Sequence, residues 1–330
     1  MSKLKKSFFV LIAIIFIVVV IPFIIIYNIC GFYDGEKNDV GQIPQITDST
    51  VIKVYIAKED KVEEMNINDY LMGVVSAEIP ASFNEEALKA QAVAARSYLV
   101  YHMNSYEKNG TPENHKGADV CTDYRHCQAW MSEADRRASW DAKDADANWE
   151  KIKSAVLATS GEVMTYNGDV INAVFHSTSS GKTENAADVW GSDIPYLKSV
   201  DSSGDKEAPK YNSENSFTAD EFKAKAESAL GGLDWSKGLF SNIERSNAGG
   251  ITSITIGGKT IKGTKFREIY GIRSTNVQIS ESDGKIIMSV HGYGHGVGMS
   301  QYGANYLAES GKNYKEILKA YYTGVDIVKK

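Results

Sequence analysis

The amino-acid sequence predicts an α+β fold, with an N-terminal transmembrane helix followed by an extracytoplasmic body of helices packed on antiparallel hairpins. Three observations support this class. An uncharged apolar run occupies residues 8–26, a long helical pattern occupies residues 84–103, and glycine-centred turns between strand patterns recur in the second half of the chain. Because helices and hairpins are segregated along the chain rather than alternating, we expect no parallel α/β sheet.

The composition is that of a folded protein. The chain has 330 residues, of which 43% are hydrophobic and 24% charged. Its net charge of −6 argues against a nucleic-acid partner, because nucleic-acid binding depends on positive charge.

The first thirty residues have the pattern of a membrane anchor. Lys3, Lys5 and Lys6 precede the apolar run, which at about 1.5 Å per residue is long enough to cross a bilayer. A cleaved signal peptide is the alternative, but no small-x-small cleavage site follows the run. The lysines favour a cytoplasmic N-terminus. We therefore expect a cytoplasmic tip and anchor at residues 1–30, a linker at 31–50 and an extracytoplasmic domain at 51–330.

Local patterns predict the elements of this domain in chain order. Residues 51–65 resemble a strand pair, and residues 68–77 and 84–103 have the apolar spacing of helices. Asn-Gly, Gly-Gly and Asp-Gly pairs fit the left-handed backbone of hairpin turns. The remaining expected elements are a helix at 145–159, hairpins at 162–176, 251–261 and 277–290, and short helices at 264–270 and 314–322.

Glu78 is a candidate general acid. It follows the apolar residues Leu71, Val74 and Val75 and precedes Pro80, so it is expected at the C-terminus of a helix. Desolvation and the helix dipole both disfavour a charged carboxylate there and favour a raised pKa. A protonated carboxyl near neutral pH is what general-acid catalysis requires. The alternative is a solvated glutamate in a loop.

Two cations on the next helix are candidates for holding a polar or anionic substrate. Lys89 and Arg96 are seven residues apart and so share a helix face. The alternative is that Lys89 forms an ion pair with Glu85 and that Arg96 is solvated.

His115, Cys121, His126 and Cys127 form a candidate metal site. Two thiolates and two imidazoles make a tetrahedral donor set that suits Zn²⁺, although the spacing is not that of a standard zinc finger. A disulfide between Cys121 and Cys127 is the alternative. A metal bound by all four side chains would be structural, whereas one bound by three would keep a place for water or substrate.

Residues 291–303 contain five glycines, which indicates unusual backbone conformations or close backbone contacts. We expect this segment to form a groove wall in which His295, Ser300 and Gln301 face a polar ligand. A second metal site at His291 and His295, or a tight structural turn, are the alternatives.

Five motifs taken together resemble the stage II sporulation protein D family, and the likeness runs from about residue 51 to residue 330. The motifs are Tyr-Leu-x-Gly-Val-Val-x-x-Glu-x-Pro at 70–80, Glu-Ala-Leu-Lys-Ala-Gln-Ala-Val-Ala-Ala-Arg-Ser-Tyr at 86–98, Phe-His-Ser-Thr-Ser-x-Gly-x-Thr-Glu at 175–184, Asp-Val-Trp-Gly with Pro-Tyr-Leu at 188–197, and Gly-His-Gly-Val-Gly-Met-Ser-Gln-Tyr-Gly-Ala at 294–304. Ser180 stands where many members have glycine, which bears only on local loop shape.

The resemblance implies a lytic transglycosylase that cuts the glycan strands of peptidoglycan during forespore engulfment, with Glu78 as the catalytic acid. It also implies substrate binding by Lys89, Arg96, Tyr196 and Lys198. Ser177, His295 and Gln301 are expected to join them. A His/Cys cluster of this kind is typical of clostridial members, in which it binds zinc. The implied partners are the membrane and stage II sporulation proteins P and M.

The chemistry implied for the family needs one carboxylate. Glu78 would protonate the glycosidic oxygen and then take the proton of the C6 hydroxyl as a 1,6-anhydro ring closes. Ordinary glycosidases use two carboxylates, and no second acid has a comparable sequence context. A non-catalytic wall-binding or amidase-enhancing module is the competing function. Zinc-dependent hydrolysis at the Cys/His cluster is a third.

Overall fold

The computed structural model describes residue 47 and residues 49–329, which belong to one compact unit. The expected anchor at residues 1–30 lies outside the described residues, as does nearly all of the linker at 31–50. Within the described part of the chain, no helix combines the length and the apolar character needed to cross a membrane.

Two helices that follow an N-terminal strand pair position the candidate acid. Strands β1 (Val51–Ile56) and β2 (Lys61–Asn66) are antiparallel, as expected, and lead directly into α3 (Ile67–Glu78). Asn66 caps α3 by accepting a hydrogen bond from the amide of Asn68 at 2.8 Å. The helix ends at Glu78 because Ile79, which precedes Pro80, is extended.

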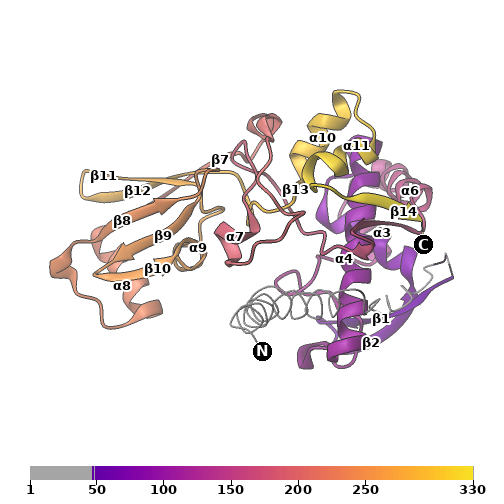
Figure 1. Cartoon of the computed structure of the whole chain (residues 1–330), viewed down its shortest axis with the longest axis horizontal. Helices are drawn as coiled ribbons and strands as arrows, with labels where there is room; N and C mark the ends of the chain where they lie inside the picture. The colour runs from indigo at the N-terminus through magenta and orange to yellow at the C-terminus, as the bar shows by residue number, and fades with distance from the viewer. Residues whose placement is uncertain (1–46, 48, 330) are drawn as a thin grey trace, which may run out of the picture. The chain divides into compact units, whose positions relative to one another are not determined.

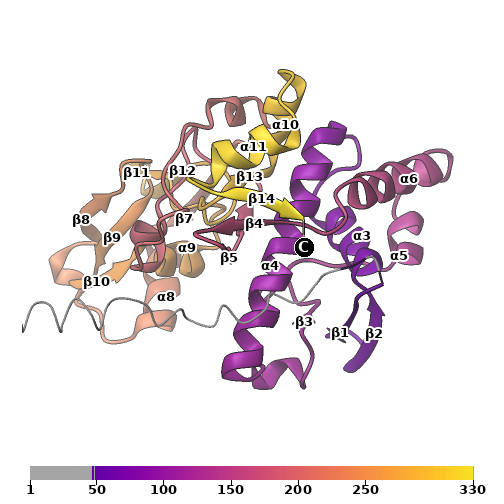
Figure 2. The same ribbon diagram turned by 45° about the vertical axis from the view of Figure 1, so that its right-hand side comes forward.

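Helix α4 (Glu85–Asn109) is the central element of this part of the structure. It extends six residues beyond the expected end and stops where Gly110 adopts φ 81°. One side of α4 packs on α3, and another packs on α6 (Ala142–Ala158) and β4 (Glu162–Tyr166). Helices α10 (Gln301–Glu309) and α11 (Tyr314–Tyr321) lie against it as well, as Figures 1 and 2 both show.

Residues from the C-terminal end complete the sheets of the central part of the chain. Strand β14 (Asp326–Lys329) pairs antiparallel with β4, and β13 (Met299–Ser300) pairs parallel with β6 (Phe175–His176). The chain therefore returns to the α3–α4 body after a long excursion. We call the body the helical body, and the intervening residues 212–291 the inserted lobe.

The inserted lobe has its own hydrophobic core and stands apart from α3 and α4 in Figure 1. Two antiparallel sheets enclose that core with two helices, and side chains such as Phe222, Phe266 and Met288 are fully buried in it. The elements are β7 (Asn212–Thr218), α8 (Ala219–Leu230), β8 (Phe240–Arg245), β9 (Ile251–Ile256), β10 (Lys259–Lys262), α9 (Gly263–Tyr270), β11 (Val277–Ser282) and β12 (Lys285–His291).

The α+β class of the described residues is confirmed, and the expected hairpin turns are present. Asn167 and Gly168 both have positive φ, 52° and 92°, and join β4 to β5 (Asp169–Val170). The expected hairpin over 162–176 is shorter than predicted, because its second strand ends at Val170 and residues 175–176 pair with β13 instead.

Candidate active site

Glu78 is the last residue of α3, and its carboxyl group is held by two partners from distant parts of the chain. Oε1 accepts a hydrogen bond from the backbone amide of Ala129 at 2.7 Å, and Oε2 accepts one from Nε2 of Gln301 at 3.4 Å. Burial raises the pKa of Glu78, and these two donors oppose the rise. The expected desolvated carboxyl at a helix C-terminus is therefore present.

The glycine-rich segment brings Gln301 to Glu78. Ser300 caps α10, and its hydroxyl donates to the buried carboxylate of Asp205 at 2.7 Å, which fixes the start of the helix. Gln301, 6% exposed, follows directly and also approaches Oε1 of Gln91 on α4 at 3.5 Å. The Gln301 amide can turn to present its carbonyl oxygen to Glu78. It can therefore serve both the protonated and the charged carboxyl.

A cleft of about 550 Å³ opens beside Glu78. One wall is the end of α3 and the segment that follows it, and the other comes from α5 (Glu133–Ala138), α6 and their connection. The cleft contains a second carboxylate, Asp144, which is exposed. The lining residues are Ala77, Glu78, Ile79, Pro80, Ala81, Ser82, Arg136, Trp140, Asp144 and Asn148.

Arg96 is not on a substrate-facing surface, and this expectation is corrected. Its side chain is fully buried, and its guanidinium donates to the backbone carbonyls of Thr159, Glu162 and Val156 at 2.8, 3.2 and 3.2 Å. Arginine suits this position because its planar fork can bond several carbonyls at the C-terminal end of α6 together. Arg96 therefore fastens α4 to α6 and β4.

Lys89 forms the ion pair that was the alternative expectation. Its ammonium lies 2.8 Å from Glu85 and 2.9 Å from Glu86, which are on the same helix. Lys89 does not line the cleft beside Glu78. Lys89 and Arg96 consequently do not form a shared cationic surface.

The other expected substrate-binding residues also lie outside the cleft lining. The hydroxyl of Tyr196 accepts a hydrogen bond from the amide of Asn172 at 3.1 Å, and Lys198 pairs with Asp193. The Ser177 hydroxyl lies 3.3 Å from that of Thr178. His295 contacts Trp190 with ring centroids 5.3 Å apart and lines a separate pocket of about 10 Å³.

The four expected metal ligands do come together. Their donor atoms all lie within 4.8 Å of one another, with Nε2 of His115 2.8 Å from Nδ1 of His126 and 3.4 Å from Sγ of Cys127. The other imidazole nitrogen of His115 faces the carbonyl of Ala118 at 3.3 Å, which leaves Nε2 available as a ligand. Cys121 and Cys127 are free thiols, so the alternative disulfide is not formed. The donor set and its compactness fit a tetrahedral metal ion.

The cluster is joined to Glu78 by a short stretch of chain. Cys127 is two residues before Ala129, whose amide binds the carboxyl of Glu78. The next residue, Trp130, packs against Gly73 on α3, where an added Cβ would lie 2.3 Å from the indole nitrogen. Glycine at position 73 therefore permits the close approach that places the Ala129 amide.

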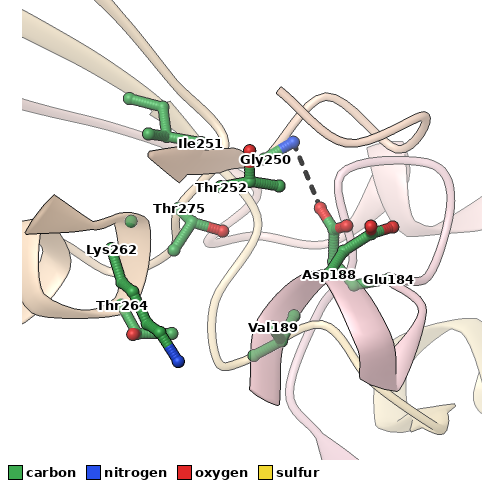
Figure 3. A pocket seen from close by; sticks show the side chains of 10 residues that line it. Glu184, Asp188, Val189, Gly250, Ile251, Thr252, Lys262, Thr264 and Thr275 are labelled. Atoms are coloured by element: carbon green, nitrogen blue, oxygen red, sulfur yellow. Dashed lines mark hydrogen bonds between the residues drawn. The ribbon is translucent and has the colours of Figure 1, made fainter. Parts of the chain in front are cut away.

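Another buried acid, Glu184, lies between the inserted lobe and the chain that precedes it and has a structural role (Figure 3). The residue is 5% exposed, burial raises the pKa of its carboxyl, and Oε1 accepts a hydrogen bond from the amide of Gly250 at 3.1 Å. The adjoining pocket, of about 10 Å³, has room for little more than one water molecule. Glu184 thus joins the start of the inserted lobe's central strand to the helical body and does not face a sugar-sized space.

Sequence reasoning missed the residues of the cleft's second wall. Asn148 lies within the helix expected at 145–159, and Arg136, Trp140 and Asp144 precede it, but none of the four was a candidate site residue. One signal was available, because Asp144 and Asn148 are four residues apart and share a helix face. Nothing local indicated that this face would lie opposite Glu78.

Comparisons with known proteins agree on one family. The family model described as Stage II sporulation protein matches residues 55–166, a range that contains Glu78 and the four clustered ligands. The chain is 41% identical over 288 residues to "Stage II sporulation protein D" of Bacillus amyloliquefaciens, covering 87% of this chain and 81% of that protein. It is 39% identical over 302 residues to the protein of the same name in Bacillus subtilis, covering 89% and 85%. An "Amidase enhancer" of Bacillus subtilis is 30% identical over 310 residues, covering 78% of this chain and 40% of that protein.

Proposed function

Because the chain belongs to the stage II sporulation protein D family, whose members act in sporulation, we propose that it is a lytic transglycosylase of peptidoglycan. It would cut between N-acetylmuramic acid and N-acetylglucosamine and leave 1,6-anhydro-muramyl ends. One observation carries this proposal. Glu78 is a desolvated carboxyl with a raised pKa at the wall of a 550 Å³ cleft.

Glu78 would act first as acid and then as base. In the first step its proton passes to the glycosidic oxygen as the bond from that oxygen to C1 of the muramyl sugar breaks. In the second step the C6 hydroxyl oxygen attacks C1, and the hydroxyl proton returns to Glu78. The acid is regenerated and no water is consumed. Gln301 supports both stages, because its amide can accept from the protonated carboxyl or donate to the charged one.

The Cys/His cluster would hold Zn²⁺ in a structural role. His115, Cys121, His126 and Cys127 supply four protein ligands, which complete a tetrahedral site and leave no open position for substrate. When bound, the ion would stabilise the segment that carries the Ala129 amide. Zinc-dependent hydrolysis is disfavoured because none of the four ligands lines the cleft.

We propose that the protein works at the sporulation septum during engulfment of the forespore. Residues 1–30 would anchor it in the membrane with the N-terminus in the cytoplasm, and the described domain would lie outside. The expected partners are stage II sporulation proteins P and M. A pull-down of the full-length protein from detergent-solubilised sporulating cells would test whether each of these two partners binds it.

The decisive experiment uses purified, peptide-free glycan strands and mass spectrometry of the products. Wild type is expected to release 1,6-anhydro-muramyl ends, and Glu78→Gln to release at least about 100-fold less. Asp144→Asn is the matched control. A transglycosylase retains activity in this variant, whereas a two-carboxylate hydrolase loses it. In H₂¹⁸O a hydrolase also incorporates the label at the new reducing end. Equal product from Glu78→Gln and wild type would refute the mechanism.

A second function is supported by the amidase enhancer among the relatives. If wild type binds glycan but releases no ends under any condition, the protein is a wall-binding module. Added amidase should then release more peptide in its presence, and Glu78→Gln should stimulate the amidase as well as wild type does.

A further inference from the structure

Arg136, at the wall of the candidate cleft, is a cation with no carboxylate partner among the described residues. It is the only cationic side chain among the ten residues that line the cleft. Its one side-chain hydrogen bond in the described structure runs from Nη1 to the hydroxyl of Ser139 at 3.4 Å. Nε is buried and has no hydrogen-bond partner within residues 49–329. A guanidinium has five N–H donors, so most of its binding capacity is unused.

The neighbouring residue shows what a satisfied arginine looks like on the same helix. Arg137 binds Glu133 at 2.7 Å and also pairs with Asp146. A partly desolvated cation without such partners is unfavourable unless an anion binds to it. Among the described residues Arg136 forms no ion pair, although the carboxylates of Glu78 and Asp144 line the same cleft, so its guanidinium remains available to an anionic ligand.

An aromatic ring adjoins this cation. Trp140 is half-exposed in the connection between α5 and α6, and the Arg136 guanidinium lies 4.7 Å from its ring centroid. Stacking on the indole holds the guanidinium in one orientation and leaves its N–H edge free. An indole that lines a cleft also presents an apolar surface suited to the C–H face of a pyranose ring.

Further along α6, Asn148 lines the same cleft, and its amide can pair with an acetamido group. The cleft thus combines a donor fork for a carboxylate, a flat apolar surface and an amide. N-acetylmuramic acid has the three matching groups in one residue, namely the lactyl carboxylate, the sugar ring and the N-acetyl group. N-acetylglucosamine has no carboxylate.

We propose that Arg136 and Trp140 form the subsite that selects the muramyl residue, with Arg136 bound to the lactyl carboxylate and Trp140 stacked on the sugar. This inference rests on the proposed function, because it assumes that the cleft beside Glu78 receives glycan. Arg136 thereby takes the carboxylate-binding role that the sequence suggested for Arg96.

Binding measured in the Glu78→Gln background tests the subsite without turnover. The ligand is a peptide-free tetrasaccharide of alternating N-acetylglucosamine and N-acetylmuramic acid, compared by calorimetry with its lactyl methyl ester. The full-length protein is expected to bind the acid about tenfold more tightly than the ester, because esterification removes the charge that strengthens the hydrogen bonds to Arg136. This comparison needs no change at Arg136, so it stands even if a variant at that position fails to fold.

Further variants then show which side chain causes the tighter binding of the acid than of the ester. Arg136→Gln is expected to bind acid and ester equally, and Trp140→Ala to weaken both about tenfold while keeping their ratio. Lys143→Gln removes the same charge from an exposed site on α6 outside the cleft lining, and it should keep the full preference. Two results would overturn the proposal. One is a preference for the acid over the ester that Arg136→Gln leaves unchanged. The other is equal binding of acid and ester by the Glu78→Gln protein that still has Arg136.

The outcome for the subsite is independent of the outcome for catalysis. If wild type releases anhydro ends and acid and ester bind equally, the transglycosylase stands and the subsite is wrong. If acid binding depends on Arg136 and no ends appear, the subsite stands in a wall-binding module.

Discussion

At the scale of single residues, two effects on the pKa of Glu78 oppose each other: burial disfavours the charged carboxylate, and the hydrogen bonds that it accepts favour it. The Ala129 amide and Gln301 stabilise the carboxylate, but burial outweighs them and raises the pKa. Such a group binds its proton more tightly in the folded state than in the unfolded chain. Its contribution therefore favours folding below the unfolded pKa, about 4.3, and is progressively lost as pH rises towards the folded value.

Glu78→Gln should accordingly stabilise the protein near neutral pH. We expect its Tm at pH 7 to exceed that of wild type by roughly 1–4 °C, and the difference to shrink towards zero at about pH 4, where wild type is itself protonated. Scanning calorimetry from pH 4 to pH 8 would measure both. Glu281→Gln, on the exposed end of β11, is the control and should leave Tm unchanged at every pH. A difference that grows on acidification would mean that the site favours the carboxylate.

Local patterns could identify Glu78 but not the residues that face it. An apolar helix that ends before Ile79-Pro80 is visible in the sequence, and so is the donor chemistry of the four clustered ligands. Arg136 and Trp140 line the cleft only because tertiary packing places α5 and α6 opposite the end of α3, and no local pattern predicts that packing. Arg96 was misplaced for the same reason, because a helical pattern does not say which polar residue will reach into a neighbouring element.

At the scale of elements, α4 is held in place by a buried polar side chain as well as by apolar packing. The carbonyls that Arg96 satisfies belong to the end of α6 and the start of β4, and the hydroxyl of Ser97 on α4 also accepts a hydrogen bond from the β4 amide of Met164 at 2.8 Å. Removing the guanidinium takes a charged donor from three buried acceptors, which costs more than the loss of a surface ion pair.

Arg96→Met should therefore lower the free energy of unfolding by about 3 kcal/mol, because the buried carbonyls of Val156, Thr159 and Glu162 each lose a charged donor. Lys89→Met, on the same helix, breaks a partly exposed ion pair and should cost about 1 kcal/mol or less. Urea unfolding followed by circular dichroism would give both values. Equal losses in the two variants would show that the Arg96 hydrogen bonds add little.

Element prediction succeeded where the signals were local. The turns at Asn167-Gly168, Gly257-Gly258 and Asp283-Gly284 fixed three hairpins, and α9 and α11 lie within a residue of their expected bounds. Strand β7 escaped prediction because its residues are mostly polar and its partner, β12, lies about seventy residues later. A strand whose partner is this distant in sequence cannot be predicted from a short local segment.

At the scale of the whole molecule, the Cys/His cluster links elements that would otherwise have little in common. Cys121 belongs to β3 (Val120–Cys121), which pairs with β1, and Cys127 begins the stretch that reaches Glu78. The segment between α4 and α5 contains few apolar residues, so a bound metal would provide much of its stability.

Chelation should consequently lower Tm by roughly 10 °C and reduce glycan cleavage with it, because loss of the metal frees the Ala129 amide. Calorimetry with and without chelator, together with elemental analysis for bound zinc, would measure this. Cys121→Ser should show the low Tm already and respond no further to chelator. Abolished cleavage with an unchanged Tm would indicate a catalytic metal instead.

The position of the inserted lobe has a consequence for the order of folding. Residues 212–291 separate β6 from its partner β13, and Gln301 approaches Glu78 across more than two hundred residues of chain. Contacts of such long sequence separation form slowly, because the intervening chain must first close a large loop. A chain emerging from the ribosome thus contains Glu78 long before it contains the residues that make its environment. Glu78 therefore gains its contact with Gln301 only at the end of folding, when the last thirty residues have docked on α4.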